Sequence, residues 1–123
     1  MKILIVEDEP KVAQRFTSHF QRQGHEVLTS DTGVGALDQL KRHQPEFMLL
    51  DLWLKDSTTG MMVLKQVRQL SPKTITVVST GLEEVSQDEI VRLGASALLR
   101  KPVRLDELDH LVTSLTSSAS TTA

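Results

Sequence analysis

Acidic and basic side chains follow three apolar runs of the chain, each of the length of a buried strand. Glu7 and Asp8 come directly after residues 3–6, Asp51 comes directly after residues 47–50, and Lys101 lies shortly after residues 97–99. In an open parallel sheet, the carboxyl ends of the strands form a ligand site. Carboxylates gathered there repel one another and lose hydration unless a cation and a basic group compensate them. The spacing therefore predicts a cation site with Lys101 beside it.

Apolar runs of strand length alternate with segments of helical period, which predicts βα units around a parallel sheet. The runs cover residues 3–6, 26–29, 47–50, 74–79 and 97–99. Most of them are continuously apolar, as in strands that are covered on both faces. The second run is short and mixed, so we expect it at an edge of the sheet. The fold class is therefore α/β, with five right-handed βα units in one domain.

The segments between the runs have the features of amphipathic helices. Apolar residues at helical spacing are Val12, Phe16 and Phe20 in the first helix, Val34, Leu37 and Leu40 in the second, Val63, Val67 and Leu70 in the third, and Leu108, Leu111, Val112 and Leu115 in the fifth. The expected N-cap of the second helix is Asp31 or Thr32, and Ser86 begins a capping box for the fourth. Gly24 and Gly94 are expected to end the first and fourth helices.

The chain ends in a segment of Ser, Thr and Ala that carries no apolar stripe. We therefore expect residues 1–115 to form the folded domain. Residues 116–123 are expected to form a flexible C-terminal tail or the start of a linker.

The composition of the 123-residue chain fits one globular domain and excludes several classes of site. The net charge is −2 and the Lys and Arg residues are scattered, which argues against direct binding of nucleic acid or of an anionic membrane. The sequence has no cysteine, which excludes disulfides, thiolate nucleophiles and cysteine metal ligands. The first strand begins almost at once, leaving no room for a signal peptide, and no apolar stretch is long enough to span a bilayer. We therefore expect a cytoplasmic protein.

Four short motifs stand at the ends of the predicted strands. They are Ile-Leu-Ile-Val-Glu7-Asp8-Glu9-Pro10, Leu-Leu-Asp51-Leu, Val-Val-Ser79-Thr80-Gly81 and Lys101-Pro102. In this order they make the chain resemble a response-regulator receiver domain of two-component (phosphorelay) signalling, over essentially its whole length up to the tail. The resemblance implies a flavodoxin-like doubly wound fold, in which five parallel strands in the order 2-1-3-4-5 are flanked by five helices.

The resemblance also implies roles for the acidic residues. Asp51 would be the phosphoacceptor, which takes a phosphoryl group from a histidine kinase or a histidine phosphotransfer protein. Asp8 and Asp51 would bind Mg²⁺ directly and Glu7 would bind it through water, consistent with the preference of Mg²⁺ for hard oxygen ligands. The backbone carbonyl of Trp53 would complete the protein ligands, so the Trp53 side chain is free to vary.

Thr80 and Lys101 are implied to contact the phosphoryl group. Lys101, with a cis bond to Pro102, would pair with Asp51 and then with the phosphoryl oxygens. Thr80 would donate its hydroxyl to a phosphoryl oxygen and draw in the following loop, which changes the surface around the fourth helix and fifth strand. Gly81 would leave the phosphoryl group an open approach. The domain would not be an enzyme beyond its own phosphorylation and dephosphorylation, and its further partners would be an unknown effector and, on phosphorylation, a second copy.

Each of these residues also has an ordinary structural explanation. Asp51 is of a type that caps loops, Glu7 and Asp8 are of a type that stabilises a helix N-terminus, and most lysines such as Lys101 are surface residues. A strand position suits β-branched Thr80 without any further role. Only the joint placement of these residues at the strand ends favours the functional interpretation.

The chain departs from the family pattern at Leu98, where the family usually has an aromatic residue that moves with the switch hydroxyl, and at Lys55, where proline is frequent. Leu98 keeps open the alternative of a pseudo-receiver, which acts as a constitutive protein-interaction module. A phosphatase with an aspartate nucleophile would need a second aspartate at position 53, where Trp53 stands. Nucleotide binding lacks its motif as well, because no glycine-rich loop follows the first strand.

Overall fold

The computed structural model describes residues 1–54, 60–81 and 85–121, with residues 117–121 described by their backbone. Lys55, one of the departures from the family pattern, lies outside the described residues. Among the described residues, no helix is both long enough and apolar enough to cross a membrane.

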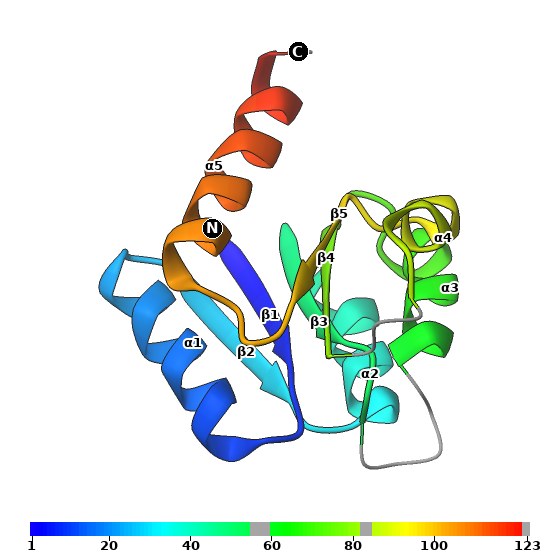
Figure 1. Cartoon of the computed structure of the whole chain (residues 1–123), viewed down its shortest axis with the longest axis horizontal. Coiled ribbons are helices and arrows are strands. Elements are labelled where there is room, and N and C mark those ends of the chain that lie inside the picture. The colour runs from blue at the N-terminus through cyan, green and yellow to red at the C-terminus, as the bar shows by residue number, and fades with distance from the viewer. Residues whose placement is uncertain (55–59, 82–84, 122–123) are drawn as a thin grey trace.

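Five parallel strands form one sheet in the order β2-β1-β3-β4-β5 (Figure 1). The strands are β1 (Lys2–Val6), β2 (Glu26–Ser30), β3 (Phe47–Asp51), β4 (Ile75–Thr80) and β5 (Ala97–Arg100). The helices are α1 (Pro10–Arg22), α2 (Gly33–His43), α3 (Gly60–Leu70), α4 (Gln87–Leu93) and α5 (Leu105–Thr121). The predicted flavodoxin-like order is confirmed, and β2 lies at the edge as its mixed sequence indicated.

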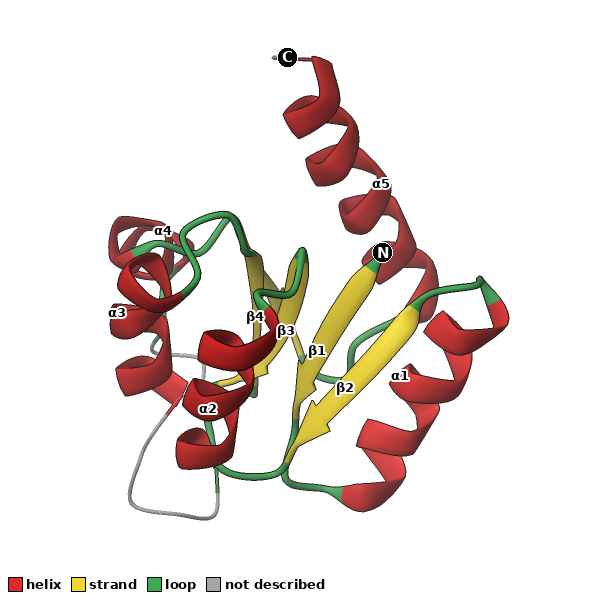
Figure 2. Ribbon diagram, turned by 180° about the vertical axis from the view of Figure 1, so that it is seen from behind, coloured by secondary structure: helices red, strands yellow, loops and turns green. Residues whose placement is uncertain are grey.

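The sheet separates two apolar layers, each covered by its own helices (Figure 2). On one face, the first layer packs α1 and α5 onto the sheet through Phe16, Phe20 and Leu108. On the other face, the second layer packs α2, α3 and α4 onto the sheet through residues such as Leu40 and Ile90. Because side chains alternate along a strand, each central strand contributes to both layers, which explains why its sequence is continuously apolar.

The helix boundaries follow from local chemistry that was mostly visible in the sequence. Thr32 rather than Asp31 is the N-cap of α2, because its Oγ1 accepts the Gly35 N–H at 3.0 Å. Ser86 caps α4 in the same way. Gly94 follows α4 with a φ of 121°, a left-handed conformation that a glycine adopts without strain.

Two expectations about the helices differ from the structure. Val34 was expected in the buried stripe of α2, but its side chain is 62% exposed. The buried residues of this helix are Gly33, Ala36 and Leu40, whose spacing places the neighbouring Val34 outside the buried face. At the other end of the chain, α5 continues as helix to Thr121, past residue 116 where the tail was expected to begin. Backbone hydrogen bonds continue a helix without needing an apolar stripe; the role of this segment as a tail or linker stays a prediction.

Candidate metal centre

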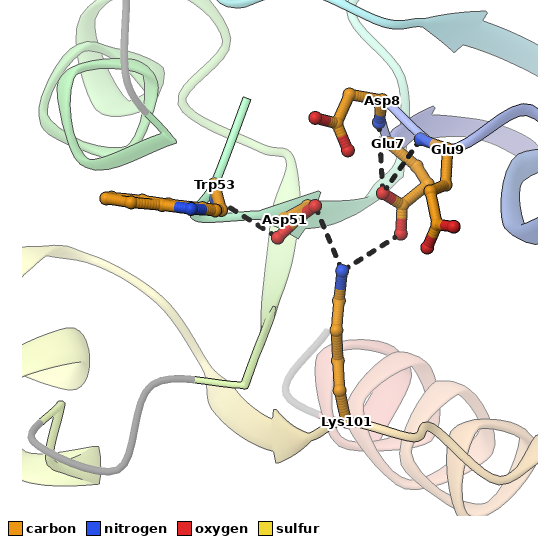
Figure 3. Close-up of polar contacts among 6 residues, drawn as sticks. All are labelled: Glu7, Asp8, Glu9, Asp51, Trp53 and Lys101. Atoms are coloured by element: carbon orange, nitrogen blue, oxygen red, sulfur yellow. Dashed lines mark hydrogen bonds and ion pairs between the residues drawn. The ribbon is translucent and has the colours of Figure 1, made fainter. Parts of the chain in front are cut away.

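The strand ends bring three carboxylates together at one edge of the sheet. Glu7 and Asp8 follow β1, and Asp51 ends β3, the neighbouring strand. One carboxylate oxygen from each of the three residues lies within 4.8 Å of the others. Figure 3 shows Glu7 and Asp51 facing a common space, with Asp8 at its rim. The sequence analysis predicted that Glu7, Asp8 and Asp51 lie together at this edge, and the structure brings them together there.

Lys101 lies between two of the carboxylates. Its Nζ is 3.2 Å from Oε1 of Glu7 and 3.0 Å from Oδ2 of Asp51 (Figure 3). The side chains of Glu7 and Asp51 are only 3% and 2% exposed, whereas Lys101 is 30% exposed. The bond from Lys101 to Pro102 is cis, as the resemblance implied. Within the described part of the chain, Lys101 is thus the one cation paired with this group of three acids, which leaves an excess of negative charge among them.

The excess of negative charge affects the protonation of Glu7. Burial, together with the hydrogen bond and the charge of Asp51, raises the pKa of Glu7 to about 7, although Lys101 acts in the opposite direction. Its Oε2 accepts the backbone N–H groups of Asp8 and Glu9 at 3.0 and 3.3 Å. Without a cation, the buried cluster is therefore most stable when one of its carboxylates keeps a proton near neutral pH.

Lys101 is held in its charged form by the same cluster. Burial alone would lower the pKa of Lys101, but the hydrogen bonds and the charges of Asp51 and Glu7 outweigh burial and raise the pKa above its usual value. The lysine therefore stays protonated at any physiological pH, as a cation that pairs with anionic oxygens at this site must be.

Trp53 fixes the second oxygen of Asp51. The backbone N–H of Trp53 donates to Oδ1 of Asp51 at 3.1 Å, so each oxygen of this carboxylate has a protein donor. Trp53 is 68% exposed, and its indole ring lies beside the site (Figure 3). The role of the Trp53 carbonyl as a metal ligand stays a prediction.

Thr80 and Gly81 lie at the same edge of the sheet. Ser79 is the register partner of Asp51, and Thr80 is the next residue of β4, with 1% of its surface exposed. A Cβ built on Gly81 would meet no atom of the described residues within 4 Å. This openness agrees with the unobstructed approach expected at this position.

Gly60 is a structural residue of the site that the sequence analysis missed. A Cβ built on Gly60 would lie 2.4 Å from the carbonyl oxygen of Asp51 and 2.5 Å from Cα of Leu52. The Gly60 N–H donates to the carbonyl of Leu52 at 3.2 Å, so the start of α3 rests directly on the end of β3. A glycine in the first turn of a predicted helix, where it lowers helix propensity, was the available indication of such a close approach.

The donor set of this edge suits a small hard cation. Glu7, Asp8 and Asp51 offer carboxylate oxygens, which Mg²⁺ prefers, and the partial exposure of Asp8 leaves room for the waters that Mg²⁺ keeps. Among the described residues, this is the one group of three or more acidic, His or Cys side chains that is close enough to hold a metal ion.

Comparison with known proteins adds a family match to this geometry. Residues 3–113 match the response regulator receiver domain family. A curated relative is the transcriptional regulatory protein KdpE of Mycobacterium tuberculosis, with 30% identity over 105 residues, which are 85% of this chain and 46% of that protein. This chain thus spans about half the length of such relatives.

Solved structures support the same fold. A CheY-like response regulator receiver domain protein from Methanospirillum hungatei superposes with a TM-score of 0.91 at 22% identity, over 99% of this chain and 98% of that one. The receiver domain of the sensor histidine kinase PA1611 from Pseudomonas aeruginosa superposes with a TM-score of 0.81 at 21% identity, over 92% of this chain and 94% of that one. The latter structure has a magnesium ion coordinated in its active site cleft.

Proposed function

The chain belongs to the response-regulator receiver domain family, and on this premise we propose that it is a phosphorylatable switch of a two-component system. Asp51 accepts a phosphoryl group from a histidine kinase or a histidine phosphotransfer protein, and the surface around α4 and β5 responds. The observation that carries the proposal is the buried carboxylate of Asp51, which is held by Lys101 and by the Trp53 N–H and lies beside Glu7 and Asp8.

In the transfer step, an oxygen of Asp51 attacks the phosphorus atom of a phosphohistidine. The new O–P bond forms as the P–N bond breaks, and the imidazole leaves with the electron pair of that bond. Phosphoryl transfer depends mainly on positioning and on neutralisation of charge. The hydrogen bonds from Lys101 and Trp53 hold the attacking carboxylate in place, and Lys101 then pairs with the phosphoryl oxygens.

The acidic residues supply the cation site of this proposal. Asp8 and Asp51 would hold Mg²⁺ directly and Glu7 would hold it through water, and the Trp53 carbonyl would complete the protein ligands. Bound Mg²⁺ supplies positive charge that offsets the negative charge of the phosphoryl group. Thr80 donates its hydroxyl to a phosphoryl oxygen, and the open space at Gly81 leaves that group accessible.

The remaining parts of the proposal concern context. Catalysis is limited to the domain's own phosphorylation and dephosphorylation, the location is the cytoplasm, and an unidentified effector receives the output. A homodimer forms on phosphorylation. The net charge of −2 supports the absence of direct nucleic-acid binding by this domain.

A pseudo-receiver is the alternative, and Leu98 is the observation that favours it. This half-buried side chain packs against the α2–α4 layer where the family usually has an aromatic residue, so the usual moving side chain is missing. The presence of Glu7, Asp8, Asp51, Thr80 and Lys101 in the sequence counts against this alternative, which is why we favour the switch.

Phosphorylation with a small-molecule phosphodonor tests the proposal. Intact protein incubated with acetyl phosphate and Mg²⁺ should gain the mass of one phosphoryl group, and chelation of Mg²⁺ should abolish the gain. The Asp51→Asn variant keeps the size of the side chain but lacks a nucleophilic carboxylate, so it should gain no mass. If the wild type gains no mass from acetyl phosphate or from phosphorylated histidine donors, the pseudo-receiver is correct. An equal gain in Asp51→Asn would place the acceptor elsewhere.

A further inference from the structure

A hydrogen bond ties the end of β5 to the segment that begins α4. Arg100, the last residue of β5, donates through Nη2 to the carbonyl oxygen of Val85. Val85 directly precedes Ser86, the N-cap of α4, whose Oγ accepts the backbone N–H of Glu89 at 3.2 Å. The guanidinium therefore holds the backbone at the point where α4 starts.

The side chains of β5 alternate between the two faces of the sheet. Leu99 packs in the first layer, which lies under α1 and α5. Leu98 and Val85 pack against the second layer, which lies under α2, α3 and α4. Arg100 stands two residues after Leu98 and so shares its face. The following residue, Lys101, reaches the carboxylates of the candidate metal centre. Two adjacent side chains at the end of one strand thus contact the centre and the start of α4.

The backbone of this strand end is also bonded to the residue expected to act as the switch. Arg100 is the register partner of Thr80, and the Lys101 N–H donates to the carbonyl of Thr80 at 2.9 Å. A displacement of Lys101 or of Thr80 therefore moves the backbone of Arg100, which lies beside both of them. Because Arg100 holds Val85, such a displacement reaches α4 through bonded and hydrogen-bonded neighbours alone.

We propose that Arg100 is the positioning residue that couples the centre to α4, in place of the aromatic side chain missing at Leu98. This inference rests on the proposed function. When Lys101 shifts its ion pairing to a phosphoryl group, the end of β5 moves, and Arg100 carries this movement to Val85. The planar guanidinium, with several N–H donors in a fixed geometry, suits a carbonyl acceptor, whereas Leu98 offers only apolar packing.

The test compares the response of α4 to a phosphoryl mimic in the wild type and in Arg100→Ala. Nuclear magnetic resonance follows the amides of Gln87–Leu93 before and after addition of Mg²⁺ and beryllofluoride. Arg100→Ala should bind both as the wild type does, because Arg100 contacts no residue of the acidic cluster in the described structure. Most of the shift change in α4 should nevertheless be lost, while the changes around Asp51 are kept.

The control is Arg104→Ala, which makes the same substitution at an exposed arginine nearby. Arg104 pairs with Asp106, and their side chains are 70% and 69% exposed. This variant should respond as the wild type does.

The outcomes separate coupling from a merely structural role. If Arg100→Ala lowers the thermal stability but keeps the full α4 response, the contact is only structural and the coupling role is refuted. A full response with unchanged stability refutes it as well. If instead the wild type binds no beryllofluoride, the proposed function has failed, and the coupling role fails with it.

Discussion

Binding of Mg²⁺ should release a proton from Glu7, and the affinity should therefore depend on pH. The pKa of this carboxyl is raised to about 7 without a cation, because it is buried beside Asp51. A cation at the cluster favours the ionised form, so protons and Mg²⁺ compete. The apparent affinity should be highest above the pKa and should fall as pH decreases through it.

The magnitude follows from a single titrating group. With this pKa, about half of the Glu7 side chains are protonated at pH ~7, about 90% at pH ~6 and about 10% at pH ~8. The apparent dissociation constant for Mg²⁺ should therefore rise about tenfold between pH ~8 and pH ~6. At neutral pH, binding should release about half a proton.

Titration calorimetry in buffers of different ionisation enthalpy measures both the affinity and the number of protons released. The matched variant is Glu7→Gln, which keeps the shape but cannot titrate. Its affinity should be low and nearly independent of pH over this range, like that of the protonated wild type. An affinity of the wild type that does not change with pH would refute the assignment of the proton to Glu7.

The same titration affects the stability of the metal-free protein. The pKa of Glu7 is raised from 4.5 in the unfolded chain to about 7 in the folded one, so the folded state binds more protons between these values. Its contribution to stability is present at low pH and is lost as pH rises through about 7, an effect of about 2–3 kcal/mol between pH ~5 and pH ~8. Burial lowers the pKa of His25 from its usual 6.5, so the contribution of His25 to stability falls as pH falls below that value, opposite to the effect of Glu7. Urea denaturation of the wild type relative to Glu7→Gln therefore isolates the effect of Glu7.

Three further perturbations test other parts of the site. Asp8→Asn should weaken Mg²⁺ binding strongly, because it replaces a charged ligand by a neutral one of the same shape; calorimetry with unchanged affinity would exclude Asp8 as a ligand. The fluorescence of Trp53, the only tryptophan, should change in two saturable steps on addition of Mg²⁺ and then of acetyl phosphate, and the second step should be absent in Asp51→Asn. Gly60→Ala should lower the free energy of unfolding by about 2 kcal/mol, because its Cβ would press on the backbone of Asp51 and Leu52; a loss near zero in urea denaturation would mean that α3 can shift without cost.

The sequence predicted the sheet and the acidic cluster because both depend on short, local patterns. Residues such as Leu49 and Leu50 are buried on both faces of a central strand, so their continuous apolar run was sufficient to place β3. Asp51 then had to lie at the carboxyl edge, since the strand ends there. The order of the strands came from the resemblance, because alternating βα units alone allow several arrangements.

Features that depend on packing between distant segments could not be predicted in the same way. Val34 has the spacing of a buried residue, but the helix turns Gly33 and Ala36 towards the sheet, and small residues give no hydrophobic indication of this choice. The contact of Gly60 with the end of β3 requires the position of α3, which the sequence pattern does not give. The raised pKa of Glu7 likewise depends on how deeply its side chain is buried beside Asp51.

The alternation of side chains along β5 has an evolutionary consequence. In this strand of four residues, Leu98 and Leu99 pack in opposite layers. Arg100 donates to the carbonyl of Val85, and the next residue, Lys101, contacts the carboxylate of Asp51. Loss or gain of a single residue within this strand would exchange the two faces and turn the lysine away from the acids. Descendants of this gene can therefore exchange Leu98 for another apolar residue, but they must keep Arg100 and the number of residues in β5.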